Sequence, residues 1–181
     1  MTGNSDMTMH EGAAIPTDDL KRTLTIANPQ APDLPHISVA GDTYTILVSG
    51  AQTDGRYCLI DMHIPPGGGP PPHRHDFEEM FTLLEGELPF TFRGETVTVA
   101  AGSTVNIPAN APHSFKNTSG KAIRMLCMCT PSGLDEFFLA VGDPVDTRTA
   151  RPPHLSPEEI AERQAKAGAL AGKYRTELLK P

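Results

Sequence analysis

Cysteine is scarce in this 181-residue chain, which also contains no tryptophan. The three cysteines are Cys58, Cys127 and Cys129, an odd number with two at alternate positions of one predicted strand. This pattern does not indicate a disulfide framework, and we interpret all three as small buried apolar residues. Because such cysteine usage is typical of a reducing compartment, we expect a cytoplasmic protein.

The chain also lacks an excess of positive charge and any long apolar run. The formal net charge is −7, which argues against a nucleic-acid footprint, and no helix-turn-helix pattern is present. No apolar run approaches the length needed to span a membrane, and the N-terminus shows no basic segment followed by an apolar one. We therefore expect neither nucleic acid nor a membrane among the partners.

Proline and glycine, by contrast, are abundant and dispersed, with 18 and 16 residues respectively. Frequent turn residues between short alternating apolar segments predict many short strands. A chain of this length suits one domain with a core of its own. The sequence therefore predicts an all-β architecture, either a closed barrel or two packed sheets.

Three histidines and one glutamate stand at positions that favour a shared metal ion. His73 and His75 are two residues apart and would point to the same face of a strand, and Glu79 has the same parity. His113 opens another alternating segment directly after a turn at residues 108–112. Imidazole and carboxylate together suit a divalent transition metal: Fe, Mn, Ni, Co, Zn or Cu.

Each of these residues taken alone is more often an ordinary surface or core residue than a ligand. The combination of a His-x-His pair, a glutamate of matching parity and a later strand-opening histidine makes coincidence a poor explanation. Two neighbours were weighed and set aside. His63 has the opposite parity to its strand's apolar row, and Glu78 is adjacent to Glu79 but faces the other way, with only a minor chance of replacing it.

The two segments that carry these residues resemble the two motifs of the cupin superfamily. The first motif is matched at every fixed position by Gly67, five residues, His73-x-His75, three residues, Glu79, six residues and Gly86. The second is matched by Gly102, five residues, Pro108-x-Asn110, two residues, His113, three residues and Asn117. Asn110 stands where glycine is usual, a mild departure because asparagine tolerates the left-handed conformation.

The resemblance implies the cupin double-stranded β-helix, a jelly-roll barrel, with a short helix after the barrel and a C-terminal helix. The chain is similar to small single-domain bacterial cupins (monocupins) of the quercetinase-like kind, which resemble flavonol 2,3-dioxygenases. The likeness includes the Gly-Gly-Gly-Pro-Pro-Pro run before His73, Pro131-Ser132-Gly133 with Phe137-Phe138, and the acid-capped last helix.

Function on this scaffold is open between three hypotheses. The resemblance implies a dioxygenase that acts on a flavonol-like or other small enolic or aromatic substrate, with dioxygen as the second substrate. Glu79 would then be both a metal ligand and the catalytic proton acceptor. The alternatives are a metal-binding cupin that binds or senses a small molecule without turnover, and a metal-dependent isomerase or decarboxylase. The register of Phe81, Phe115 and Met125 relative to the proposed ligands makes them candidates for the substrate pocket.

We divide the chain into a flexible arm (1–35), the barrel (36–142), and a linker with the C-terminal helix (143–181). Residues 1–14 lack any periodicity and are expected to be disordered, whereas Leu20, Leu24 and Ile26 could pack on the barrel. A short helix is predicted at 135–141. Ser156 followed by a proline and Glu159 predicts a capped helix that continues to near Leu179.

A homodimer is the predicted assembly. Residues 123–129 read as a strand that is apolar on both faces and so needs a covering layer, either the C-terminal segment or a second subunit. A barrel of this size also has edge strands to cover.

Overall fold

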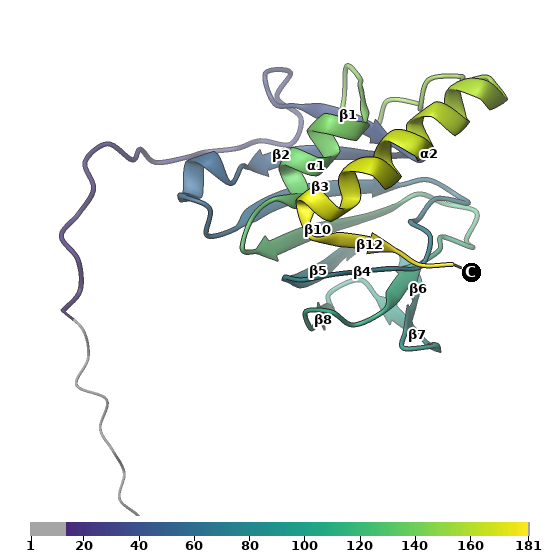
Figure 1. Cartoon of the computed structure of the whole chain (residues 1–181), viewed down its shortest axis with the longest axis horizontal. Helices are drawn as coiled ribbons and strands as arrows, with labels where there is room; N and C mark the ends of the chain where they lie inside the picture. Colours follow the sequence, from purple (N-terminus) through teal and green to yellow (C-terminus); the bar gives the residue numbers. More distant parts are fainter. Residues whose placement is uncertain (1–13, 181) are drawn as a thin grey trace, which may run out of the picture.

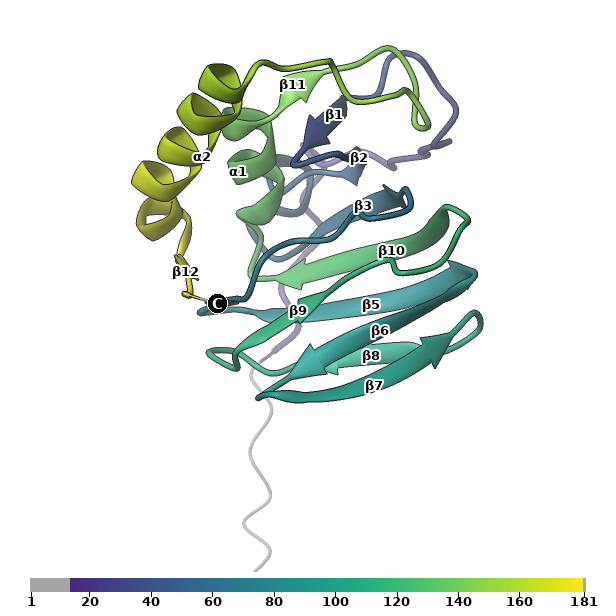
Figure 2. The same cartoon turned by 90° about the vertical axis from the view of Figure 1, so that its right-hand side faces the viewer.

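The computed structural model describes residues 14–180, so the disorder predicted for residues 1–14 lies, apart from Ala14, outside the described part of the chain. The elements form two β-sheets and two α-helices, and the helices lie together at one end of the barrel (Figures 1 and 2). This arrangement confirms the all-β barrel of two sheets, with a helix after the barrel and a C-terminal helix.

The larger sheet has seven strands and the smaller one five. The seven strands run in the order β11 (Asp143–Pro144), β1 (His36–Val39), β2 (Asp42–Val48), β3 (Cys58–Ile64), β10 (Ile123–Thr130), β5 (Glu78–Glu85) and β8 (Thr104–Ile107). The five run in the order β12 (Thr176–Leu178), β4 (His73–His75), β9 (His113–Phe115), β6 (Glu87–Phe92) and β7 (Glu95–Ala100). All strand pairs are antiparallel, as expected for strands joined by short turns.

Strict alternation of residues places the core between the sheets. In β5 and β10 every second side chain is buried, which is the period-two pattern of a strand with one face inward. Three phenylalanines from different strands, Phe81, Phe90 and Phe115, pack with ring centroids 5.4–5.6 Å apart. They hold the two sheets together at the depth of the candidate site.

The outer face of β10 is less apolar than the sequence suggested. It begins with Arg124, whose guanidinium bonds to the fully buried carboxylate of Asp61 on β3 at 2.6 and 2.8 Å. Arg148, from the segment after the barrel, reaches the other oxygen of Asp61 at 3.2 Å. The C-terminal segment of the same chain therefore covers part of this face, and the two cations balance the buried charge.

The arm at 14–35 contradicts one expectation. Leu20, Leu24 and Ile26 are 86–88% exposed and do not pack on the barrel. The arm runs away from the molecule before it joins β1 (Figure 1).

Both helices begin as predicted, but the second ends early. Helix α1 spans Leu134–Val141, and α2 spans Pro157–Ala171 with the Ser156–Glu159 capping box in place. The predicted continuation to Leu179 is wrong. A 3₁₀ turn (Gly172–Tyr174) and Arg175 at φ 58° redirect the chain into β12, which pairs with β4. The free edge of β4 supplies hydrogen bonds that outweigh the helical periodicity of a stretch already weakened by Gly168 and Gly172.

The remaining short element is a 3₁₀ turn at Ala51–Thr53. In the described part of the chain, each helix falls short of the length and apolar character that crossing a membrane requires.

Candidate metal centre

The four candidate ligands lie on three strands that meet at one point. His73 and His75 are the first and last residues of β4, and a bend at 76–77 turns the chain so that Glu79 follows as the second residue of β5. His113 opens β9 and stands directly opposite His73 in the strand register. The matching parity of these residues agrees with the sequence prediction.

Their side chains form a compact, buried cluster. One ligand atom from each of the four residues lies within 4.8 Å of every other. Glu79 Oε2 is 2.9 Å from His75 Nε2 and 3.1 Å from His113 Nε2, and the rings of His73 and His113 have centroids 4.3 Å apart. His75, Glu79 and His113 are at most 3% exposed.

The backbone sets the orientation of all three imidazoles. Nδ1 of His73, His75 and His113 bonds to the carbonyl oxygens of Pro71, Phe77 and Ala111 at 2.9, 3.0 and 2.9 Å. A carbonyl can only accept, so each Nδ1 carries a proton, and in His75 and His113 Nε2 is the ring nitrogen that faces Glu79. This is the support that metal-binding histidines receive in general. The donor set therefore fits a transition metal.

The pKa values follow from burial and mutual contact. Burial, together with the nearby His113, lowers the pKa of His73 to about 4. Burial alone would raise the pKa of Glu79, but hydrogen bonds and charges from His113 and His75 outweigh it and hold that pKa below its usual range. For His113 burial opposes protonation, yet the bond to Glu79 raises its pKa. The cluster thus combines a carboxylate with imidazoles whose protons a metal would displace.

Two cysteines contact the opposite oxygen of Glu79, a relationship that the sequence analysis missed. The thiol of Cys127 donates to Oε1 at 3.2 Å, and Cys129 lies 3.8 Å from the same atom. Burial raises the pKa of Cys127 above its usual range, so the thiol stays protonated and remains a donor. Both cysteines are fully buried, as predicted, but Cys127 also holds the carboxylate so that Oε2 faces the imidazoles. The signal available in the sequence was that both cysteines have the same parity as the apolar row of β10, and so point into the barrel.

Backbone features lock the strands that carry the ligands. Asn110 adopts the left-handed conformation at φ 68°, which explains why asparagine replaces glycine there, and its N–H donates to the His75 carbonyl at 2.7 Å. Gly69, at φ 121°, passes so close to the Phe115 carbonyl that no Cβ would fit. The buried carboxylate of Asp42 accepts from the Gly69 N–H and the Tyr44 hydroxyl. These contacts hold β4 and the segment that leads into it.

The neighbours set aside from the sequence stay outside the cluster. Glu78 turns away and accepts hydrogen bonds from the Ala109 N–H and the Asn106 amide, both at 3.1 Å. His63 lies on β3 with the half-buried outward-facing residues. Asn117, the last motif residue, is buried and donates to the Ile64 and Lys121 carbonyls, which is a structural role.

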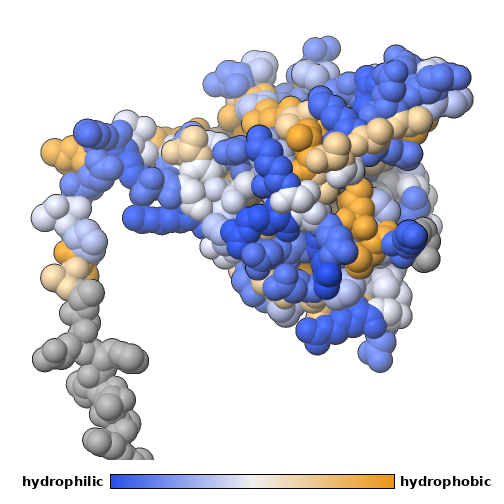
Figure 3. Space-filling model, in the orientation of Figure 1, coloured by the Kyte–Doolittle hydropathy of each residue, from blue (hydrophilic) through white to orange (hydrophobic). Residues whose placement is uncertain are grey.

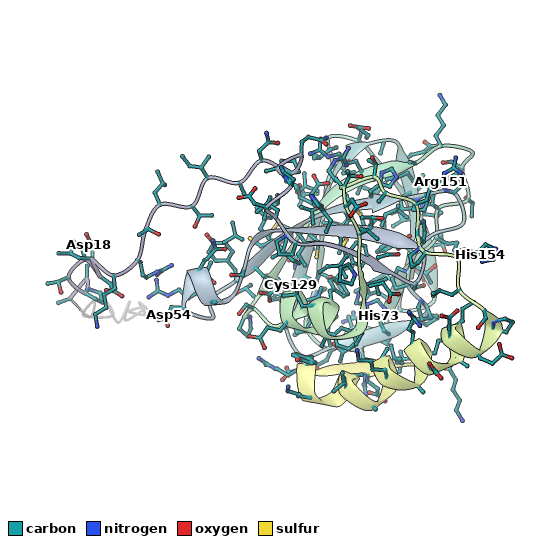
Figure 4. All side chains as sticks on the ribbon, turned by 90° about the horizontal axis from the view of Figure 1, so that it is seen from above. Asp18, Asp54, His73, Cys129, Arg151 and His154 are labelled. Atoms are coloured by element: carbon teal, nitrogen blue, oxygen red, sulfur yellow. The ribbon has the colours of Figure 1, made fainter. Side chains whose placement is uncertain are left out.

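A cavity of about 220 Å³ opens beside the cluster. Phe81 and Phe115 line it, whereas Met125 is fully buried and lies outside its lining. The sequence did not suggest the remaining lining, which includes Tyr44 from β2, Phe138 from α1, and Ala167 and Leu178 from the C-terminal segment. Figure 4 shows His73 on the side of the barrel that α2 covers.

Comparison with known proteins identifies the domain. Residues 60–129 match the family model Cupin_2, the cupin domain. The chain is 30% identical over 128 residues to quercetin 2,3-dioxygenase of Bacillus subtilis, which is 70% of this chain and 37% of the relative. It is 39% identical over 59 residues to the HTH-type transcriptional regulator PuuR of Escherichia coli, 33% of this chain and 32% of the relative. The chain thus spans about a third of the length of these curated relatives.

A solved structure agrees on the architecture. A predicted oxalate decarboxylase from Thermotoga maritima matches with a TM-score of 0.54 at 20% identity, over 59% of this chain and 98% of that one. At this identity the likeness concerns the fold. Together these findings show a cupin domain at residues 60–129 and a likeness to a quercetin 2,3-dioxygenase, which confirms the resemblance and the fold class expected from the two motifs.

Proposed function

We propose that this cupin protein binds one divalent transition-metal ion per chain through His73, His75, Glu79 and His113. The observation that carries the proposal is the backbone hydrogen bond to Nδ1 of all three histidines, which directs Nε2 of His75 and His113 at the buried carboxylate of Glu79, with His73 in the same cluster. Fe, Mn, Ni, Co, Zn and Cu all suit this donor set.

We further propose that the site catalyses addition of dioxygen to a small enolic or aromatic substrate. The likeness to quercetin 2,3-dioxygenase supports this, as does a cavity with aromatic walls that ends at the cluster. When bound, the metal supplies positive charge for a substrate oxyanion and, if it is redox-active, electrons for dioxygen chemistry. Glu79 is the catalytic residue that accepts the proton of a substrate hydroxyl, and its lowered pKa keeps it anionic at neutral pH.

The experiment compares metal content and oxygen uptake in the wild type, Glu79→Gln and the matched control Glu78→Gln. The wild type should contain one metal per chain and consume oxygen with a flavonol or a simple enol. Glu79→Gln keeps its size and one oxygen, so it should load at raised metal concentration yet turn over about 10²–10⁴-fold more slowly. Glu78→Gln should behave like the wild type, because Glu78 faces away from the cluster.

Near-normal turnover in loaded Glu79→Gln would remove the proton-accepting role. The competing functions are binding or sensing without turnover, which the match to a transcriptional regulator favours, and a metal-dependent isomerase or decarboxylase reaction. Metal-replete protein that takes up no oxygen with any flavonol or enol would favour one of these.

We also propose a homodimer. The exposed Leu20, Leu24 and Ile26 of the arm, together with the edge strands β7 and β8, offer surface for a second copy. Sedimentation should show a dimer that Leu24→Ser with Ile26→Ser weakens. A monomer at roughly tens of micromolar, the range of ordinary weak interfaces, would contradict the proposal.

A further inference from the structure

A second and larger hollow lies beside the metal cavity. This groove has a volume of about 450 Å³ and runs between α2, the β1–β2 turn and the segment that precedes α2. Its walls include Val141, Leu155, Ile160 and the aliphatic part of Arg163. Figure 3 shows hydrophobic surface around α1 and beneath α2 on this side of the molecule.

The groove and the metal cavity share part of their lining. Val39, Ala40, Val141, Gln164 and Ala167 border both. Three elements thus form the junction: the end of β1 with the β1–β2 turn, the end of α1, and one face of α2. Residues of the His/Glu cluster line the metal cavity but not the groove, so the groove adds to the space that adjoins the cluster.

The volumes of the metal cavity and the groove limit the size of the molecule that each can hold. At about 220 Å³ the metal cavity lies below the roughly 300–1,000 Å³ of typical small-molecule sites. With the groove of about 450 Å³ added, the combined space falls within that range. The metal cavity alone therefore favours a small, single-ring molecule, and the combined space favours a larger one.

The charges in the groove restrict the chemistry of its occupant. Arg163 and Asp143 neutralise one another through two parallel bonds of 2.7 and 2.8 Å. His154 also lines the groove, on the segment before α2 (Figure 4). In the described part of the chain, the Gln164 side chain at the junction makes no hydrogen bond and is exposed. The groove therefore suits an uncharged, largely apolar group that can also accept or donate a hydrogen bond.

We propose that the groove beneath α2 is a substrate subsite, which holds the distal rings of an elongated, uncharged, multi-ring substrate whose oxygen-bearing ring lies at the His/Glu cluster. This inference rests on the proposed metal site and adds the length of the substrate to it. Gln164 and Ala167 lie where the two spaces meet and so set which molecules can extend past the junction.

The test uses two probes that share one metal-binding head. Maltol is a single 3-hydroxy-4-pyranone ring, and flavonol carries the same head extended by further rings. Affinities are measured anaerobically on metal-loaded, full-length protein, so that the readout is binding rather than activity. Ala167→Phe fills the junction, and Ala165→Phe adds the same ring on the exposed side of α2 as its matched control.

Flavonol affinity should fall about 10-fold or more in Ala167→Phe, the order expected for losing burial of one ring, while maltol affinity stays unchanged. Ala165→Phe should alter neither. Because Ala167 also borders the metal cavity, a second variant lies in the groove alone. Ile160→Asp places a charge on an apolar wall and should weaken flavonol only, with Ala161→Asp as its control.

Wild-type affinity for flavonol in both Ala167→Phe and Ile160→Asp would overturn the subsite, as would a wild-type protein that binds maltol but not flavonol. If Ala167→Phe also loses maltol, Ile160→Asp decides: unchanged flavonol affinity there refutes the subsite. Failure of the wild-type protein to bind metal, or to bind either probe, would instead refute the proposed metal function on which the subsite depends.

Discussion

Two regions line the same cavity, but only one of them supplies candidate metal ligands. The motif strands β4, β5 and β9 supply every imidazole and carboxylate of the candidate metal centre. The C-terminal segment, α2 with β12, adds residues such as Ala167, Thr176 and Leu178 to the lining and no candidate ligand. One region carries the chemistry, and the other covers it and completes the sheet beside it.

The two regions contribute to the buried site through different kinds of contact. The motif ligands are held by hydrogen bonds within a few residues, such as His75 Nδ1 to the Phe77 carbonyl. The cover reaches the site from a hundred residues away through strand pairing, with Thr176 opposite His75 and Leu178 opposite His73. Local bonds set the direction of each ligand, and distant pairing sets how firmly the ligand strand is held.

The sharpest way to break the comparison is to remove a ligand. His75→Ala and His113→Ala should each lower metal affinity by more than the roughly 10–100-fold typical of losing a supporting group, because a direct donor is lost. Elemental analysis of purified variants measures the metal content. His63→Ala is the control, since His63 lies outside the cluster. Full occupancy in both variants would place the metal elsewhere.

Removing the cover should have a smaller effect on the same quantity. A chain that stops after Arg175 lacks β12, so β4 keeps only its pairing with β9. We expect metal affinity to fall about 10-fold, near the low end for outer supports, with a lower melting temperature. Glu177→Ala, which removes only the exposed ion pair to Arg74, should cost less than about 1 kcal/mol of unfolding free energy. Equal metal affinity in the truncated and full-length chains would show that β12 does not support the ligand strand.

The thiol contact to Glu79 is a subtler support within the motif region. Cys127→Ala removes the donor to Oε1, and the metal affinity should fall by up to about 10-fold because the carboxylate is free to rotate. Cys127→Ser keeps a hydroxyl donor and should retain more of the affinity. Cys58→Ala, which changes a buried cysteine with no hydrogen bond to Glu79, controls for lost packing. Competition titration against a chelator measures all three, and identical affinities would exclude the contact as a support.

A change at Asp42 tests whether its contact with Gly69, in the segment before β4, affects the stability of the fold rather than the metal affinity. Burial raises the pKa of Asp42 to about 7 despite hydrogen bonds from Tyr44 and Gly69, and its Oδ1 has no hydrogen-bond partner in the described part of the chain. The pKa of Asp42 in the fold exceeds its ordinary value of 3.8. The contribution of the protonated Asp42 to stability is therefore complete below pH 3.8 and is lost as pH rises through about 7.

Asp42→Asn should therefore flatten the fall in unfolding free energy between about pH 4 and 7, a change on the order of a few kcal/mol at most. Metal affinity should not change, because the amide oxygen still accepts from the Gly69 N–H. Chemical denaturation at several pH values measures the slope. Parallel slopes in the wild type and the variant would mean that Asp42 ionises normally in the fold.

Much of the site could be predicted because its information is local. A two-residue spacing puts His73 and His75 on one face of a strand whatever surrounds them. Two prolines and an asparagine predict the turn before His113. Cys127 was interpreted only as a buried residue, since its thiol gains a role from the neighbouring strand that carries Glu79. The apolar residues of the arm were predicted to pack on the barrel, yet they are exposed, since periodicity does not say what surface is in reach.

The sequence by itself determined the strands that carry the motifs, the parity of the four candidate ligands and the N-terminal cap of α2, because these depend on alternation and on bonds between near neighbours. Only the tertiary structure decided where α2 ends. Residues 176–178 continue a helical pattern, but the open edge of β4 offers them strand hydrogen bonds that a helix end would leave unmade. The same decision places Gln164 and Ala167 over the cavity, because the end of α2 and the pairing of β12 fix how the helix lies on the barrel.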